Sequence, residues 1–161
     1  MLTRRALNAY GLLICIVLIS IAMYMEIAMD LNPCPLCVMQ RVMIIAMGLV
    51  FLLALIHHPQ GKGRFVYGLL ALLFAAGGLG FAGRQIWLQH LPAGQVPACG
   101  PDLYFMIQNF PLTETLRTLF VGTGDCAKVV WTFLGMSIPE WSFVCFCGLA
   151  VLSVWGMLKS R

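Results

Sequence analysis

The fold of this chain is decided by residues 34–56, CPLCVMQRVMIIAMGLVFLLALI, where a pair of cysteines leads directly into a long apolar run. After Arg41, every residue as far as Ile56 is apolar or glycine. A helix needs about 20 largely apolar residues to cross the hydrocarbon core of a bilayer. Backbone groups in lipid must also pair within their own segment, so a transmembrane helix is predicted from about 37 to 56.

Three further stretches have the same apolar character, and they run from about Tyr10 to Met29, Phe65 to Gly83 and Trp141 to Leu158. The four spans predict an all-α transmembrane bundle that forms a single integral-membrane domain, residues 1–161. The composition agrees, because 61% of the residues are hydrophobic and 10% are charged, whereas about 25% are charged in soluble domains. The first span is too long for a cleaved signal peptide, so it is expected to be retained.

The basic residues predict how the bundle is oriented. They precede the first span, separate the second from the third and follow the fourth: Arg4, Arg5, Lys62, Arg64, Lys159 and Arg161. In a four-span chain these regions lie on one side, which the positive-inside rule assigns to the cytoplasm. Both termini are therefore expected in the cytoplasm, with two periplasmic loops at about 30–34 and 84–140. The net charge of +4 forms no basic stripe, so no nucleic-acid partner is expected.

Four of the seven cysteines are expected on the oxidising side, two in each loop: Cys34, Cys37, Cys99 and Cys126. The other three fall inside the spans and are interpreted as small apolar packing residues: Cys15, Cys145 and Cys147. An even set of thiols that faces an oxidising compartment is typical of disulfides. A structural disulfide explains Cys99 with Cys126, because it would close a long loop.

The spacing of Cys34 and Cys37 points to redox chemistry rather than to a structural bridge. So small a ring constrains little of the chain, whereas a two-residue spacer is typical of dithiols that cycle. A purely structural pair and a zinc site stay open as alternatives, although Cys99 and Cys126 lack a second CxxC or a histidine at ligand spacing. The sequence contains no nucleotide-binding motif and no cluster typical of haem or iron–sulfur sites. An acceptor dissolved in the bilayer is therefore expected, and no metal.

The local sequence also predicts how this pair is activated. Pro35 suits the first position of a helix, which makes Cys34 the expected N-cap and Cys37 a first-turn residue. Free amides and the helix dipole at that end favour a thiolate. Arg41 follows Cys37 by four residues, so the two side chains share a helix face. The guanidinium is expected to pair with the Cys37 thiolate or with a carbonyl oxygen of a bound acceptor; alternatively, it extends to the outer headgroups.

The long loop supplies a second candidate element. Prolines and glycine surround Cys99 and predict an extended, exposed segment at residues 95–101 that another protein can bind. Residues 112–120 carry apolar side chains at helical spacing, with Glu114 and Arg117 on the other side. They are predicted to form a short amphipathic helix on the outer leaflet, or else a loop packed against the bundle.

With CPLC at 34–37, an arginine one turn later and two further cysteines in one outer loop, the chain resembles the disulfide bond formation protein B family over nearly its whole length. The resemblance implies a thiol:quinone oxidoreductase of the bacterial inner membrane. Such a protein re-oxidises a DsbA-like thioredoxin-fold partner in the periplasm and passes the electrons to ubiquinone or menaquinone.

The resemblance also implies a role for each cysteine of the loops. Cys99 is the cysteine that the donor protein attacks, and Cys126 is its disulfide partner, which passes the electrons to Cys34. The Cys34–Cys37 pair then reduces the quinone, with Cys37 in contact with the ring and Arg41 assisting it.

Three details qualify the resemblance. His90 matches a family position near the quinone, although a lone histidine at a membrane interface is more often an ordinary polar residue. Gln40 stands where some relatives carry an acid, so the local charge differs there. Helix-cap reasoning makes Cys34 as good a thiolate as Cys37, whereas the spacing to Arg41 and the resemblance favour Cys37.

Overall fold

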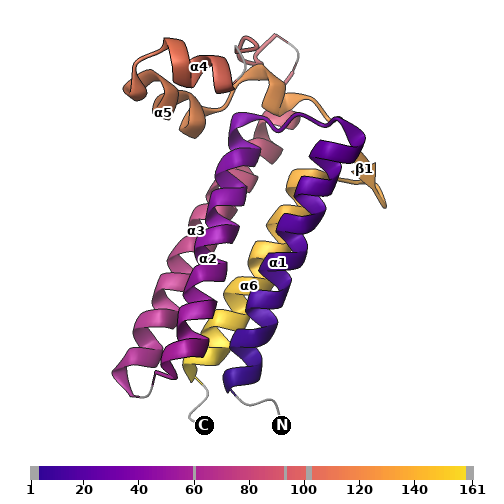
Figure 1. The fold of residues 1–161 in the computed structure, drawn as a ribbon. Helices are drawn as coiled ribbons and strands as arrows, with labels where there is room; N and C mark the ends of the chain where they lie inside the picture. Colours follow the sequence, from indigo (N-terminus) through magenta and orange to yellow (C-terminus); the bar gives the residue numbers. More distant parts are fainter. Residues whose placement is uncertain (1–3, 60, 93, 101–102, 159–161) are drawn as a thin grey trace.

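Four long helices run side by side in the computed structural model, which describes residues 4–59, 61–92, 94–100 and 103–158 (Figure 1). They are α1 (Arg4–Met29), α2 (Pro35–His57), α3 (Lys62–Gln89) and α6 (Ile138–Leu158). Each is long and apolar enough to cross a membrane, which confirms the four predicted spans. Of the basic residues used for orientation, the Arg4 side chain, Lys159 and Arg161 lie outside the described part of the chain.

The third span ends later than the sequence predicted. Its helix continues past Gly83 to Gln89, so Arg84 lies within the helix and does not begin a loop. The Arg84 guanidinium lies 4.3 Å from the centre of the Trp87 ring, and its Nε donates a hydrogen bond to the carbonyl oxygen of Val121 at 3.3 Å. A charge with such partners at the end of the bundle is compatible with helix, so the last turns of α3 belong to the bundle.

Helix α3 is central to the packing, since it contacts both α2 and α6, while α1 packs on α2. Small residues on α3 allow this close approach, and Phe146 of α6 is buried directly over Gly78. Small residues at a helix interface let two membrane helices approach closely. Cys15 is buried in the same core, as expected. Cys147 is exposed on the surface of α6, so its interpretation as a packing residue was wrong.

Replacing Gly78 by alanine is expected to destabilise the bundle by about 1–3 kcal/mol. A Cβ atom at this position would overlap the Phe146 ring, which is itself fully buried and has little room to move. Gly80→Ala is the matched control, because a Cβ there meets nothing within 4 Å. Thermal unfolding in detergent should give a lower midpoint for Gly78→Ala only. Equal midpoints for the two variants would contradict the close α3–α6 contact.

A layer of short elements covers one end of the bundle (Figure 1). It contains α4 (Leu103–Asn109), α5 (Leu112–Val121), the 3-10 helix η1 (Gly124–Ala127) and a two-stranded antiparallel hairpin, β1 (Thr132–Phe133) with β2 (Met136–Ser137). The helix predicted at 112–120 is confirmed as α5, whereas α4 and the hairpin were not predicted. The side chains of Leu112 and Leu116 lie outside the described residues, so contact of α5 with the membrane stays a prediction.

Candidate active site

The start of α2 brings the first two cysteines together. Cys34 is the N-cap residue with an extended backbone, φ −68° and ψ 163°, and Pro35 opens the helix, as predicted. Proline is preorganised for this position because its φ is fixed and it has no N–H to satisfy. The first turn then places the Cys34 Sγ 3.0 Å from the Cys37 Sγ, with the Cys34 thiol as donor. Both cysteines are half-buried, and the structure describes them as free thiols.

The loop layer inserts a third sulfur beside this pair. Cys126, in η1, is fully buried with Leu36 and Leu88, under the end of α3. The single hydrogen of the Cys34 thiol can be donated to the Cys126 sulfur in place of the Cys37 sulfur, and this bond is the main reason why the pKa of Cys34 lies well above that of an ordinary thiol. The same bond, with help from the backbone at Leu36, lowers the pKa of Cys126 to about 6. Cys34 therefore lies between two possible sulfur partners that come from different loops.

The fourth cysteine is at the surface. Cys99 is exposed, as predicted for its extended segment. The segment is held in place because the Gly124 N–H donates to the carbonyl oxygen of Ala98 at 3.1 Å, and any side chain at Gly124 would collide with the backbone at Pro97. Cys99 lies close to Asp125, whose pKa is lowered first by its ion pair with Lys128 and to a smaller extent by Cys99. A partner protein can therefore reach Cys99 beside η1, the short helix that carries Cys126.

Gln85 of α3 contacts both cysteines of the pair, although it is not among the site residues predicted from the sequence. Its Nε2 lies 3.2 Å from the Cys37 Sγ and 3.4 Å from the Cys34 Sγ. The predicted third span ends at Gly83 and therefore leaves Gln85 in the loop. A signal was present, however, since the buried positions of α3 at Ala71, Ala75, Gly78, Ala82 and Gln85 recur at intervals of three and four residues.

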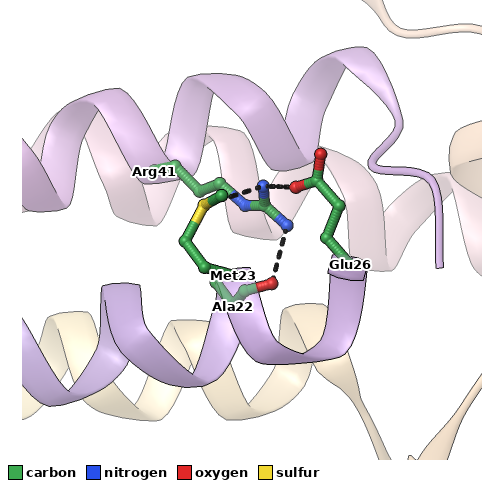
Figure 2. A network of polar contacts seen from close by, with 4 residues as sticks. All are labelled: Ala22, Met23, Glu26 and Arg41. Atoms are coloured by element: carbon green, nitrogen blue, oxygen red, sulfur yellow. Dashed lines mark hydrogen bonds and ion pairs between the residues drawn. The ribbon is translucent and has the colours of Figure 1, made fainter. Parts of the chain in front are cut away.

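Arg41 has a different partner from the ones that were predicted. Figure 2 shows its guanidinium turned toward α1, where it forms an ion pair with Glu26. Its Nη2 also donates to the carbonyl oxygen of Ala22 at 3.2 Å, and Nη1 lies 4.0 Å from the Met23 sulfur. Glu26 is the only acid in the first span, a signal that could have suggested this pairing. The pair links α1 to α2 and offsets the cost of placing each charge near the membrane boundary.

His90 lies at the C-terminal end of α3 and is exposed. Its Nδ1 is 2.8 Å from the carbonyl oxygen of Ile86, so its ring is attached to the last turn of the same helix. None of its described hydrogen bonds reaches a cysteine. A role of His90 near an acceptor stays a prediction.

Two cavities lie elsewhere in the described part of the molecule. One has a volume of about 200 Å³, and its lining residues include Arg5 and Arg64. The other is more open, has a volume of about 560 Å³, and is lined by residues of α2, α3 and α5 that include Met43 and Phe120. Neither is lined by the four candidate cysteines.

Known proteins share these features along nearly the whole chain. The family model described as "Disulfide bond formation protein DsbB" matches residues 4–156. The protein named "Disulfide bond formation protein B" of Nitrosococcus oceani is 50% identical over 147 residues, which cover 91% of this chain and 87% of that protein. Proteins with the same name from Methylococcus capsulatus and Marinobacter nauticus are each 51% identical. The matches cover 89% of this chain and 88% of the Methylococcus protein, and 98% of this chain and 94% of the Marinobacter protein.

Proposed function

The chain belongs to the DsbB family of disulfide bond formation proteins, and we propose that it re-oxidises a DsbA-like thioredoxin-fold protein and passes the electrons to a membrane quinone. Membership of the family implies a disulfide-generating oxidoreductase. The observation that carries the finer proposal is the position of the Cys34 sulfur, which contacts Cys37 on one side and Cys126 on the other. Electrons that enter the second loop thus have a direct route into the first.

The proposed relay consists of thiol–disulfide exchanges. A thiolate of the reduced donor attacks Cys99 in a Cys99–Cys126 disulfide, and Cys126 leaves as a thiolate. Hydrogen bonds from the backbone at Leu36 and Thr123 favour the departing Cys126 thiolate. The second thiol of the donor then attacks the mixed disulfide, so that the donor leaves oxidised and Cys99 is released as a thiol.

The second exchange moves two electrons from one loop to the other. The Cys126 thiolate attacks Cys34 in the Cys34–Cys37 disulfide, and Cys37 leaves. Cys99 then displaces Cys34 from Cys126, which restores the Cys99–Cys126 disulfide and leaves Cys34 and Cys37 reduced. Re-oxidation of this pair gives up two electrons and two protons, and the pair is then ready for the next donor.

The residues around Cys37 fit a quinone as the final acceptor. The Cys37 thiol is only half-buried at the start of a membrane-spanning helix. The Arg41 guanidinium has five N–H donors, and its contacts with Glu26, Ala22 and Met23 engage only some of them. The remaining donors can bind a carbonyl oxygen. When it is bound, ubiquinone or menaquinone supplies an acceptor for the two electrons and two protons, and His90 is proposed to lie near it.

The proposed location is the bacterial inner membrane, with the loop layer in the periplasm. Helices α1 and α6 have their outer ends, Arg4 and Leu158, at the end of the bundle away from the loop layer (Figure 1). The basic residues Arg5, Lys62 and Arg64 lie toward that end, which the positive-inside rule places in the cytoplasm. The loop layer then faces the compartment where disulfides persist.

The proposed function predicts that the purified full-length protein reduces a short-chain ubiquinone with electrons from a reduced thioredoxin-fold dithiol protein. Cys99→Ala should lower this activity at least about a thousandfold, because the donor has lost its point of attack. Quinone reduction is followed by its ultraviolet absorbance, and donor oxidation by thiol titration. Cys147→Ala is the control, since that thiol is exposed on α6, away from the loop layer. Full donor-dependent turnover by Cys99→Ala would contradict the proposed relay.

A further inference from the structure

Gln85 is a buried amide in contact with the reacting sulfurs. Only 4% of its surface is exposed, as is the case for Gln40 on the facing helix α2. Burying a polar amide among the helices of a membrane protein costs free energy unless its donors and acceptor find partners. The two polar partners that Gln85 finds are another buried amide and the Cys34–Cys37 pair. Its position is therefore tied to the chemistry of that pair.

Gln40 determines which end of the Gln85 amide faces the sulfurs. The Gln40 Nε2 donates a hydrogen bond of 2.7 Å to the Gln85 Oε1. With its oxygen engaged by Gln40, Gln85 directs its Nε2 toward the cysteines. The approach of the Cys37 Sγ to Oε1 is longer, at 3.5 Å. An amide NH2 has two N–H donors, and two sulfurs lie within reach of this one.

An N–H donor beside a sulfur affects its charged and neutral forms differently. A neutral thiol is a weak acceptor, whereas a thiolate forms a charge-assisted hydrogen bond that is about twice as strong as a neutral one. Burial penalises a thiolate that has no such donor. The amide therefore favours a negative charge on the pair.

Besides the Cys34 thiol, which donates to the Cys37 sulfur at 3.0 Å, and the free amides at the start of α2, few other groups can supply that charge stabilisation. From η1, the titratable group against the pair is Cys126, which accepts from Cys34 and so adds no positive charge. Arg41, on the next turn of α2, is turned toward Glu26 of α1. Arg84, next to Gln85 on α3, donates to the Val121 carbonyl oxygen. Among the described residues, the side-chain N–H donor that contacts both sulfurs is Gln85.

We propose that Gln85 is a catalytic residue that holds the thiolate of the reduced Cys34–Cys37 pair, and that Gln40 is the positioning residue that keeps the Gln85 Nε2 turned toward the sulfurs. The inference rests on the proposed function. In the step concerned, the pair loses two electrons and two protons as the S–S bond forms, and the quinone takes up both to become quinol. A pre-formed thiolate has already given up one of those protons, so Gln85 supports the start of this step.

The test measures thiolate reactivity in the full-length protein without donor or quinone. The reduced protein is alkylated with iodoacetamide over a range of pH, and modification of the 34–37 peptide is followed by mass spectrometry. Gln85→Leu should lower the alkylation rate near neutral pH about tenfold or more, because a hydrogen bond to a charged group is lost. At high pH, where the more acidic thiol of the pair is ionised in both proteins, the rates of the variant and the unsubstituted protein should converge.

Gln40→Leu leaves Gln85 in place but removes the bond that orients it, so a smaller decrease of about threefold is expected near neutral pH. Gln89→Leu is the matched control, because Gln89 lies one turn farther along α3 and accepts from Ser137 at 2.9 Å. Its pH profile should equal that of the unsubstituted protein. If Gln85→Leu does not fold, the pH profile of alkylation for Gln40→Leu tests the proposal in its place.

A pH profile for Gln85→Leu that superimposes on the unsubstituted one would overturn the proposal, and so would a decrease that persists unchanged at high pH. The second result would show altered access rather than altered ionisation. Because the measurement needs neither quinone nor donor, it is independent of whether this chain reduces quinone. Absence of quinone reduction with a normal Gln85 effect would therefore contradict the proposed function alone.

Discussion

Cys126→Ser is expected to abolish donor-dependent quinone reduction, with a loss of about a thousandfold or more. Cys126 is the sulfur of the long loop that the structure places against Cys34, and a serine hydroxyl can neither form a disulfide nor carry electrons. The Cys34–Cys37 pair itself stays intact in this variant. A small dithiol such as dithiothreitol, which can attack that pair directly, should therefore still support quinone reduction. Steady-state assays with the two reductants separate the relay from its final step.

Cys126 also has a pH-dependent reactivity in the fully reduced protein. Its pKa is lowered from 9.0 to about 6, mainly by the hydrogen bond from the Cys34 thiol, which exists only while Cys34 is reduced. In that state the Cys126 thiolate is the main form above about pH 6 and is lost as the pH falls below it. Alkylation of Cys126 by iodoacetamide in the reduced protein should therefore stay nearly constant from pH 8 to 7 and fall up to about tenfold per unit below pH 6. Cys145→Ser, a change inside α6, should preserve this profile. Donor-driven turnover by Cys126→Ser would contradict the relay.

The sequence predicted the scaffold well because its strongest signal is physical and local. Residues 42–56 are apolar throughout, and only a helix satisfies their backbone in lipid. The N-cap role of Cys34 also follows from local sequence, since it depends on Pro35 alone. The predicted end of α3 is too early, because the charge of Arg84 suggests a loop, whereas the buried positions of the helix continue to Gln85 and Leu88.

The contacts of the site depend on tertiary packing that no spacing expresses. Arg41 shares a helix face with Cys37, yet the packing of α1 on α2 brings Glu26 within reach, and the guanidinium turns to it. Likewise, a gap of many residues separates Cys34 from Cys126, and nothing local predicts that η1 lies over the start of α2. The resemblance supplied the order Cys126 to Cys34, and the contact between the two sulfurs gives that order a geometric basis.

Cys37→Ser is expected to stop turnover and to trap a disulfide between Cys34 and Cys126. Cys34 has two sulfur neighbours, with Cys37 at 3.0 Å and Cys126 in hydrogen-bonding contact. Once Cys37 is replaced by serine, the disulfide that Cys34 can form in this geometry is the one with Cys126. Such a bridge can pass no electrons to a quinone, because Cys34 has lost the partner with which it forms a disulfide on re-oxidation. The remaining turnover should fall by about a thousandfold or more.

The trapped state is measured by alkylating the oxidised variant, digesting it without reductant and identifying the linked peptides by mass spectrometry. The peptide of residue 34 should be joined to the peptide of residue 126, and Cys99 should be recovered alkylated. Adding Cys126→Ala to Cys37→Ser is the matched control, since it removes the linked peptide and leaves Cys34 free for alkylation. Recovery of alkylated Cys34 from Cys37→Ser alone would show that the two loops do not exchange electrons through this sulfur. In that case the donor's electrons would need another entry to the pair, and the contact between Cys34 and Cys126 would be one of packing only.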